Sequence, residues 1–331
     1  MNNQIVLAMM QLPGVGRKTV TGRFDFGQNR ECTVENIKKI LCNFSKNAIA
    51  EGVIETAIAQ SFKIINDCKK EGMGIVTWLD EDYPERFRFT DDPPAVLYYK
   101  GDLFKINTIP SVAIIGTREP TQIGVKAAVK LGEIFVRYGY GVVSGLAVGC
   151  DSFGHKGCLS KNGYTIAILA GGLDSIYPKQ NIGLAQEILE KGGCLLSEYP
   201  PYTKTQKQYL VERDRLQSGL SDGVVVIETD EDGGAMHAIR YAEKNNRPIA
   251  CFKHDKKYSE EKKVRGNIML ENAGRAMALG SNDDIDAFCE KMIQCRENRW
   301  QVEKNDERTQ INPVQMSLFD FVDDKNGEDN E

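Results

Sequence analysis

The sequence predicts an α/β protein built on an extended Rossmann-like sheet, doubly wound and mostly parallel, with a small helical domain before it and a disordered acidic tail after it. Between residues 111 and 252, short apolar segments alternate with amphipathic segments of helical spacing. Such alternation is typical of parallel strands covered by helices on both faces. Glycine follows nearly every apolar segment, where a strand would turn into a helix. We expect domains at residues 1–72, 73–296 and 297–331.

The first 72 residues are expected to be helical. Apolar side chains recur at helical spacing in segments such as residues 53–65, and Gly72 and Gly74 close that run. Two strands should follow, because residues 74–79 and 95–99 are rich in β-branched and aromatic side chains and bracket an Asp- and Pro-containing connection. They extend the sheet that comes next.

The central region should contain the parallel strands and their helices in strict alternation, and one more strand and helix should close the body. The expected strands are 112–115, 141–143, 165–169, 194–196, 223–227, 248–252 and 276–279, and the expected helices are 121–138, one from residue 151, one from about 181, 208–219, 234–246 and 284–295.

The tail carries most of the net negative charge. The chain has a net charge of -5, and from Glu303 onward nine acidic residues stand against three basic ones, so the rest of the chain is close to neutral. A basic groove on the body is compatible with this distribution. The polar, acidic composition beyond residue 296 predicts disorder.

Composition also excludes several classes of protein. No stretch approaches the roughly 20 apolar residues of a membrane span, and no signal-like segment develops at the N-terminus, so we expect a cytoplasmic protein that does not bind membranes. The nine cysteines are scattered and form no C-x-x-C pair, as expected for reduced thiols. With three histidines and no metal-ligand spacing, we expect no metal and no cofactor.

The turns after the predicted strands carry the candidate binding residues. In an open parallel sheet, ligands bind beyond the carboxyl ends of the strands. Glycine there lets backbone N–H groups approach an anion, and each following helix directs its positive end to the same place. A phosphate-bearing ligand is therefore predicted, although each glycine taken alone also fits a plain tight turn. The candidate residues are Gly116, Thr117, Arg118, Gly145, Gly149, Asp151, Gly171, Gly172, Gly233 and Gly234.

Neither of the usual nucleotide-binding motifs occurs in these turns. The first turn, which starts at Gly116, lacks the G-x-G-x-x-G pattern of dinucleotide-binding proteins, and no G-x-x-x-x-G-K-[ST] sequence is present. Asp151 and His155 lie four residues apart at a helix start, but no nucleophile or metal accompanies them. We interpret them as a helix N-cap carboxylate and a packing imidazole, and we expect that the protein is not an enzyme.

Over residues 74–290 the sequence resembles the DprA/Smf family of DNA-processing proteins. The segments that carry the resemblance occur in the family's order. They are Tyr83-Pro84, Pro93 to Leu97 with Lys100-Gly101, Val112 to Arg118, Val143 to Ala147 with Gly149 to Asp151 and His155, Gly171 to Asp174 with Tyr177-Pro178, Leu196 to Glu198 with Pro200, Arg213 to Leu216 with Ser218 to Ser221, and Gly266-Asn267 with Asn272-Ala273.

The resemblance implies a homodimer that binds single-stranded DNA, protects it and delivers it to a RecA-type recombinase, as in the uptake of DNA during natural transformation. By position, Arg118, Arg213 and Arg215 match arginines for which the family implies phosphate contacts, and an arginine fork suits phosphate. Lys156 could extend this basic rim. The alternative is that the arginines form ordinary ion pairs with Glu212, Asp214 or Glu228, and that Lys156 is simply solvated.

Three departures from the family pattern stand out. Asp214 occupies the middle of the arginine segment, Lys253-His254 replaces an expected Pro-Gly, and the winged-helix domain common at the family's C-terminus is not recognisable. A divergent role in replication, repair or defence fits these departures as well as transformation does.

Two flanking motifs suggest further contacts. Gly14, Gly16, Arg17 and Lys18 belong to a segment that resembles a helix-hairpin-helix turn, whose backbone amides bind DNA phosphate without reading bases; a plain turn between helices is the alternative. In the tail, Gln315 to Phe319 resembles the pentapeptide that binds the bacterial sliding clamp. Leu318 and Phe319 would be its apolar anchors and Gln315 its polar contact; chance similarity is the alternative.

A second function from a different class is a sensor or hydrolase of a nucleotide-derived ligand on the related lysine-decarboxylase-like fold. Those hydrolases carry P-G-G-x-G-T-x-x-E after the equivalent strand. Here Arg240 stands in place of the glutamate in the segment from Asp232 to Arg240, which disfavours hydrolysis and leaves ligand sensing open.

Overall fold

A computed structural model describes residues 4–22, 24, 26–27, 31–42, 49–258 and 260–319, without the side chains of 300 and 302–319. The core of the fold is one sheet of strands, all of them at predicted places. They are β1 (Gly74–Thr77), β2 (Val96–Gly101), β3 (Ser111–Ile115), β4 (Gly141–Ser144), β5 (Thr165–Leu169), β6 (Cys194–Ser197), β7 (Gly223–Val226), β8 (Ile249–Phe252) and β9 (Met277–Leu279).

The nine strands lie in the order β1-β2-β6-β5-β4-β3-β7-β8-β9. The pairs β1–β2 and β2–β6 are antiparallel, and all the other pairs are parallel. This is the predicted doubly wound, mostly parallel, Rossmann-like sheet. From β3 the chain builds the sheet in both directions, first through β4, β5 and β6 and then through β7, β8 and β9, so the switch point lies between β3 and β7.

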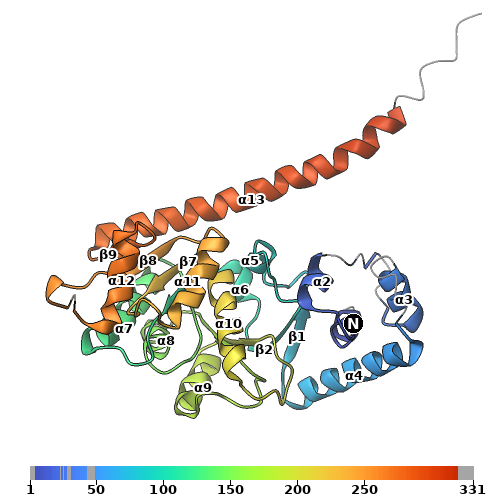
Figure 1. Ribbon diagram of the computed structural model, residues 1–331, viewed down its shortest axis with the longest axis horizontal. Coiled ribbons are helices and arrows are strands. Elements are labelled where there is room, and N and C mark those ends of the chain that lie inside the picture. Colours follow the sequence, from blue (N-terminus) through green and yellow to red (C-terminus); the bar gives the residue numbers. More distant parts are fainter. Residues whose placement is uncertain are drawn as a thin grey trace, which may run out of the picture.

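Helices cover both faces of the sheet (Figure 1). Those of the sheet region are α7 (Gln122–Arg137), α8 (Cys150–Ser160), α9 (Ile182–Glu190), α10 (Lys207–Gly219), α11 (Ala235–Lys244), α12 (Lys262–Asn272) and α13 (Asn282–Phe319), with the short elements α5 (Glu85–Arg88), α6 (Lys105–Thr108), η1 (Lys179–Asn181) and η2 (Lys256–Tyr258).

Alternate residues of β3 show how the two faces are divided. Val112 and Ile114 pack with apolar residues of α7, α8 and α13, whereas Ala113 and Ile115 pack with residues of α11 and α12. The same division continues in the other half of the sheet, where α10 packs on the second face. Burial on both faces explains why these strands are almost continuously apolar in sequence.

The described residues of the N-terminal region form four helices, in agreement with the predicted helical character: α1 (Gln4–Met10), α2 (Arg17–Gly22), α3 (Val34–Cys42) and α4 (Glu51–Lys70). Their buried residues, such as Ile5 and Ile54, belong to the same apolar cluster as Leu195 of β6 and Ile188 of α9. The helices therefore pack directly against the antiparallel end of the sheet.

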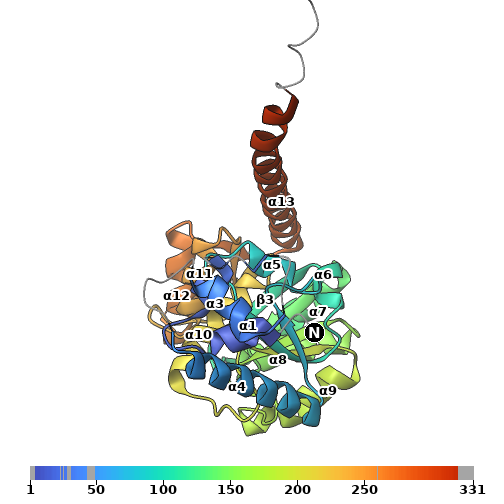
Figure 2. The ribbon, with the colours of Figure 1, turned by 90° about the vertical axis from the view of Figure 1, so that its right-hand side faces the viewer.

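The last helix, α13, runs past residue 296 to Phe319, whereas the sequence predicts disorder from residue 297. It begins against β9 and then projects away from the body (Figures 1 and 2). An α-helix satisfies its backbone hydrogen bonds internally, so a polar composition that excludes a packed core does not exclude a helix. Residues 320–331 lie outside the described part of the chain.

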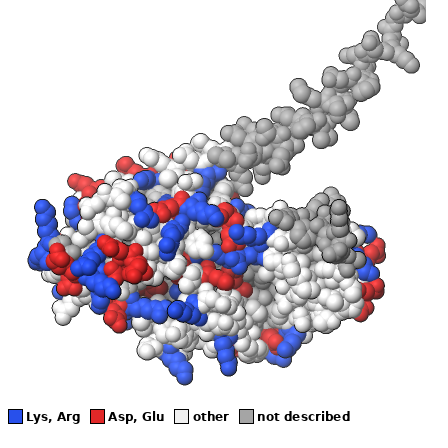
Figure 3. Space-filling model, in the orientation of Figure 1, with Lys and Arg blue, Asp and Glu red and all other residues white. Residues whose placement is uncertain are grey.

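Charged side chains of both signs are interspersed over the sheet region on the face that Figure 3 shows, and the N-terminal helices carry few charges in this view. Recognition of a polyanion must therefore depend on a local arrangement of charges and not on the net charge. Among the described helices, none has the length and apolar content that crossing a bilayer requires. The nine cysteines are all unpaired thiols.

Candidate anion-binding cleft at the switch point of the sheet

A cleft of about 860 Å³ opens beyond the carboxyl ends of β3 and β7. We call it the switch-point cleft. The loops that follow β3 and β7 lead to helices on opposite faces of the sheet, and their divergence leaves a crevice between them. Its walls include the predicted residues Gly116, Thr117, Arg118, Asp151, Arg213, Gly233 and Gly234, together with Tyr177, Lys207, Leu210, Val211, Asp214, Gln217, Asp230, His237, Lys262 and Lys263.

Several candidates lie outside these walls. Gly145 lines a smaller adjoining pocket with Arg118 and Arg213. Neither cavity is lined by Gly149, Lys156, Gly171, Gly172 or Arg215. Lys156 is exposed on α8, with its ammonium 5.2 Å from the centre of the Phe153 ring. The structure thus brings together only part of the predicted site.

The two arginines of the cleft differ in their environment. Arg118 is exposed, and within the described part of the chain no carboxylate pairs with it. Arg213 is only 4% exposed. Its Nη1 donates to the carbonyl oxygen of Ile168 at 2.9 Å, and its Nε lies 3.4 Å from Asp214 Oδ1. Arg118 can therefore reach a ligand directly, while Arg213 holds positive charge in the wall behind it.

Several backbone amides of the glycine-containing turns already have an acceptor. The N–H of Gly145 donates to Asp151 Oδ2 at 3.1 Å, that of Gly172 to the carbonyl of Thr203 at 2.8 Å, and that of Gly233 to the carbonyl of Asp230 at 3.1 Å. The N–H of Thr117 donates to the carbonyl of Glu228 at 2.7 Å. These amides stabilise the turns and are not available to an anion, so the predicted amide cradle is wrong for these positions.

Close approach of other groups explains the glycines instead. A Cβ at Gly145 would overlap the guanidinium group of Arg213, and a Cβ at Gly172 would overlap Asp174 Oδ1. Gly149 is required for two reasons. Its φ of +90° is a backbone conformation that disfavours side chains, and a Cβ there would overlap the backbone of Thr117 and Arg118. The glycines shape the cleft by letting its walls pack tightly.

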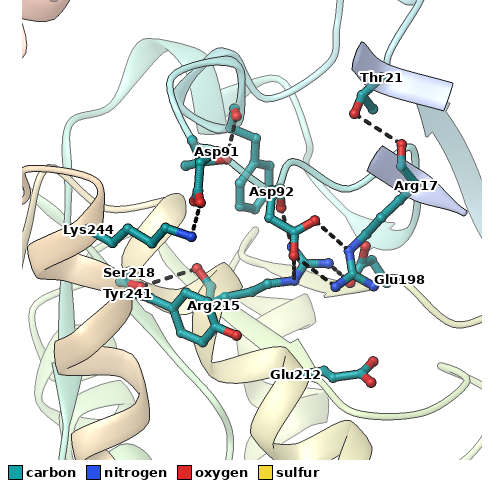
Figure 4. Close-up of polar contacts among 12 residues, drawn as sticks. Arg17, Thr21, Asp91, Asp92, Glu198, Glu212, Arg215, Ser218, Tyr241 and Lys244 are labelled. Carbon is teal, nitrogen blue, oxygen red and sulfur yellow. Dashed lines mark hydrogen bonds and ion pairs between the residues drawn. The ribbon is translucent and has the colours of Figure 1, made fainter. Parts of the chain in front are cut away.

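Arg215 does not reach the cleft, contrary to the expectation for a phosphate contact. Its side chain is 4% exposed. It forms an ion pair with Glu198, its Nε lies 3.6 Å from Asp92 Oδ2, and its Nη1 donates to the carbonyl of Asp92 at 2.9 Å. In Figure 4 Arg17 and Arg215 meet at the carboxylate of Asp92, and Glu198 lies beside them as the partner of Arg215. The ion-pair alternative is therefore correct for Arg215, although with other partners than those considered.

Asp151 and His155 are structural, as the sequence indicates, but Asp151 is not an N-cap. It is the second residue of α8, and its carboxylate turns back to the loop after β4, where it accepts from Gly145. Burial raises its pKa, against the charge of Arg213. His155 is fully buried with Nδ1 2.7 Å from Thr165 Oγ1, and burial lowers its pKa to about 3, so the ring is neutral.

Asp214 adds a titratable acid to the cleft. Burial and the neighbouring Asp151 carboxylate raise its pKa to about 7, and the charges of Arg213 and Arg118 limit the rise. The departure noted in the sequence is thus a partly buried carboxyl that is close to half-protonated at neutral pH.

The sequence analysis missed two lysines of the cleft. Lys262 and Lys263 lie at the start of α12. The Nζ of Lys262 is 3.2 Å from Asp230 Oδ2, and the Nζ of Lys263 is 3.6 Å from Glu119 Oε2. Their adjacency in sequence was the available signal, but α12 itself was not predicted, so nothing placed them at the sheet edge. Tyr177, which is 50% exposed, adds an aromatic face to the wall.

The helix-hairpin-helix-like segment forms a turn between α1 and α2. Gly14 has a φ of +76°, and no atom lies within 4 Å of a Cβ built at Gly14 or Gly16, so the turn is open. Lys18 is exposed, but Arg17 is not available to DNA. Its Nε and Nη2 donate to the two carboxylate oxygens of Asp92 at 2.9 and 2.8 Å (Figure 4). The side chains of Gln315, Leu318 and Phe319 lie outside the described part of the structure.

Comparisons with known proteins agree with the fold and the motifs. The family model for DNA recombination-mediator protein A matches residues 74–290. The chain is 36% identical over 224 residues to Protein Smf of Synechocystis, an alignment that covers 67% of this chain and 55% of the relative. It is 33% identical over 214 residues to DNA processing protein DprA of Bacillus subtilis, covering 63% and 72% of the two chains. The chain thus spans about half the length of the Synechocystis relative.

Solved structures give the same result. The X-ray structure of DNA processing protein A from Streptococcus pneumoniae superposes with a TM-score of 0.71 at 26% identity, covering 87% of this chain and 97% of that one. DNA processing protein A from Helicobacter pylori, studied for its single-stranded DNA binding mode, gives 0.58 at 30% identity, covering 66% and 96%. The matching family model describes a DNA recombination-mediator protein. With the matched segment spanning the whole sheet, the chain belongs to the DprA/Smf family of DNA recombination-mediator proteins.

Proposed function

We propose that this protein binds single-stranded DNA in the switch-point cleft and acts as a non-enzymatic DNA-processing protein. The observation that carries the proposal is the exposed guanidinium of Arg118 at the carboxyl edge of β3, backed by the buried charge of Arg213. The Helicobacter pylori relative, whose structure describes a single-stranded DNA binding mode, supports the choice of ligand.

The walls of the cleft suit a single strand better than a duplex. Unpaired bases offer ring faces that stack on aromatic and apolar side chains, and such stacking tolerates any sequence. Tyr177 is 50% exposed and lines the cleft together with Leu210 and Val211. Phosphate contacts by Arg118, Lys207, Lys262 and Lys263 would run beside this apolar strip.

An electrophoretic mobility series with single-stranded, duplex and tailed DNA tests the proposal. We expect preferential, sequence-tolerant retention of single-stranded DNA that weakens as salt rises. Equal retention of duplex and single strand, or none of either, would contradict it. The same series with added nucleotides addresses the alternative of a nucleotide-derived ligand, because a nucleotide that occupied the cleft would displace the DNA.

Three finer statements belong to the same proposal: a homodimer, transfer of the bound strand to a RecA-type recombinase, and contact of the open Gly14 to Gly16 turn and Lys18 with a DNA phosphate. Size-exclusion chromatography with light scattering tests the dimer. A strand-exchange assay with DNA coated by single-strand binding protein tests the transfer, since a mediator speeds the appearance of product. The unpaired thiols fit the proposed cytoplasmic location.

Recruitment to the sliding clamp through Gln315, Leu318 and Phe319 is the remaining part of the proposal. A short apolar pair in a polar segment is a common form of groove recognition. We expect a 310–324 peptide to bind the clamp and the Leu318→Ala plus Phe319→Ala peptide to fail. Equal binding of both peptides would remove the clamp from the account.

A further inference from the structure

The edge of the sheet opposite to the switch-point cleft holds a buried cluster of arginines around one carboxylate. Asp222, 1% exposed, directly precedes β7, and its Oδ2 accepts from the backbone N–H of Ser111 at 3.1 Å. Arg86 of α5 donates from Nε to the same oxygen at 3.1 Å, and Arg299 of α13 donates from Nη2 to Oδ1 at 3.1 Å. Asp222 thus joins the amino end of the sheet to α5 and α13.

Positive charge exceeds negative charge in this cluster. Arg247 is 3% exposed, and its Nη2 donates to the carbonyls of Arg86 and Gly219 at 3.0 and 3.1 Å. Within the described part of the chain, Arg247 Nε and Nη1 and Arg299 Nη1 are buried without an acceptor. Buried cationic donors that lack acceptors are costly, so the cluster is incomplete without a further anion.

A pocket of about 350 Å³ lies against this cluster. Arg86, Arg296, Arg299 and Asp222 line it, together with Glu85 and Asn107. Arg296 has no ion-pair partner among the described side chains. The pocket is bounded by elements far apart in sequence, since its lining includes residues of α5 and of α13, and in Figure 1 α5 lies below the middle of α13.

We propose that this arginine pocket binds a small phosphate-bearing molecule. Four guanidinium groups, three in the pocket wall and that of Arg247 behind it, stand against two carboxylates, those of Asp222 and Glu85. The excess of positive charge suits a multiply charged oxyanion. Guanidinium forks donate in pairs to phosphate oxygens, and the volume lies at the lower end of the range for small-molecule sites.

Two further observations agree with this ligand. Burial and the neighbouring charges of Arg299 and Arg86 lower the pKa of Arg247 to about 9, and the carboxylate of Asp222 offsets this only in part. The pocket lies at the amino ends of β3 and β7, whereas the switch-point cleft lies at their carboxyl ends. The site is therefore separate from the proposed DNA site and does not depend on it.

Isothermal titration of the full chain with pyrophosphate, at constant ionic strength, tests the proposal. We expect saturable binding at one site per chain, weakened at least about tenfold by Arg296→Ala and partly restored by Arg296→Lys. Arg137→Ala on the exposed end of α7 removes the same charge elsewhere and should leave the affinity unchanged. Arg118→Ala reports whether pyrophosphate binds in the switch-point cleft instead. The melting temperature of each variant without ligand shows that it is folded.

Several results would overturn the proposal. They are the absence of saturable pyrophosphate binding to the unaltered protein, equal affinity of the folded Arg296→Ala variant, and a comparable loss in Arg118→Ala, which would place the anion in the switch-point cleft. A final arm adds oligothymidine to the Arg118→Ala protein loaded with pyrophosphate. Retained pyrophosphate supports a small-molecule site, whereas displacement at stoichiometric oligothymidine assigns the pocket to the DNA backbone and overturns it.

Discussion

The guanidinium group of Arg213 lies directly against the Cα of Gly145, so closely that a Cβ at Gly145 would overlap it. The N–H of Gly145 is held by Asp151 at 3.1 Å, and Arg213 Nη1 is held by the carbonyl of Ile168 at 2.9 Å. The loop after β4, the end of β5 and α10 are thereby locked together at one side of the switch-point cleft.

Gly145→Ala should displace Arg213, because neither the loop nor the guanidinium has room to move without losing a hydrogen bond. We expect a loss of about 1–3 kcal/mol in the free energy of unfolding, as for other overpacked sites, together with weaker binding of single-stranded DNA. Denaturant unfolding and a fluorescence anisotropy titration measure the two effects. Gly183→Ala in α9 is the matched control, since no atom lies within 4 Å of a Cβ built there. Identical stability of both variants would show that the contact is not tight in solution.

Asp214 should make DNA binding depend on pH near neutrality. Its pKa is raised to about 7, so it becomes neutral as the pH falls from 8 to 6, and the cleft then carries more net positive charge. We expect the affinity for oligothymidine to rise by up to about tenfold over this interval in the unaltered protein and to change much less in Asp214→Asn. A pH profile that is the same in both proteins would exclude Asp214 as its source.

The same carboxyl should also affect stability. Because its folded pKa lies above the unfolded value of about 3.9, the native state holds more protons between these two pH values, and stability falls as the pH rises from about 4 to 7. Asp214→Asn should therefore raise the melting temperature at pH 8 and have little effect at pH 4. A lower melting temperature at pH 8 would mean that the charged form is stabilised by Arg213.

Arg215→Ala should damage folding and not the cleft specifically. Removing the guanidinium leaves the Glu198 carboxylate without its buried partner and leaves Asp92 with Arg17 alone, and breaking such a buried pair costs about 3–5 kcal/mol. Denaturant unfolding of Arg215→Ala beside Arg137→Ala, an exposed arginine of α7, measures the difference. If Arg215→Ala were fully stable but lost DNA binding, Arg215 would be a DNA-contacting residue and not a structural one.

Replacing Arg17 should reduce the stability of the protein, whereas replacing Lys18 should not. Arg17→Ala removes the two-pronged contact with Asp92 that joins α2 to the sheet region, and we expect a cost of about 1–3 kcal/mol. Lys18→Ala should leave stability unchanged, since the side chain is exposed. Although burial opposes it, the contacts with Arg17 and Arg215 lower the pKa of Asp92, so their stabilisation is present above a pH of about 4 and is lost as the pH falls below it. Thermal unfolding at pH 7 and pH 3 tests both statements.

The strands were predictable from sequence because burial on both faces makes them nearly continuous apolar runs. Helix α12 was not, since only Val264, Gly266, Asn267 and Leu270 of it are buried. Asn267 is held by hydrogen bonds to Ile227 and Phe252, which lie far away in the chain, and no local pattern encodes such partners.

The residues of the switch-point cleft could likewise be predicted only in part from the sequence. Arg213 and Arg215 are two residues apart on one helix and so point about 200° apart, which means that both could not face one cleft. Which of them does so is decided by α10 packing and by Asp92, more than a hundred residues earlier in the chain. Likewise, the glycine turns were located correctly, but sequence cannot show that their amides are used by Asp151, Thr203 and Asp230.

The most direct test of the account compares the salt dependence of oligothymidine binding for Arg118→Ala and Arg137→Ala, two variants with the same net charge. If Arg118 contacts a phosphate, the slope of log affinity against log salt should shrink by about 0.7 in Arg118→Ala and stay unchanged in Arg137→Ala. Equal slopes in the two variants and the unaltered protein would contradict the placement of single-stranded DNA in the switch-point cleft.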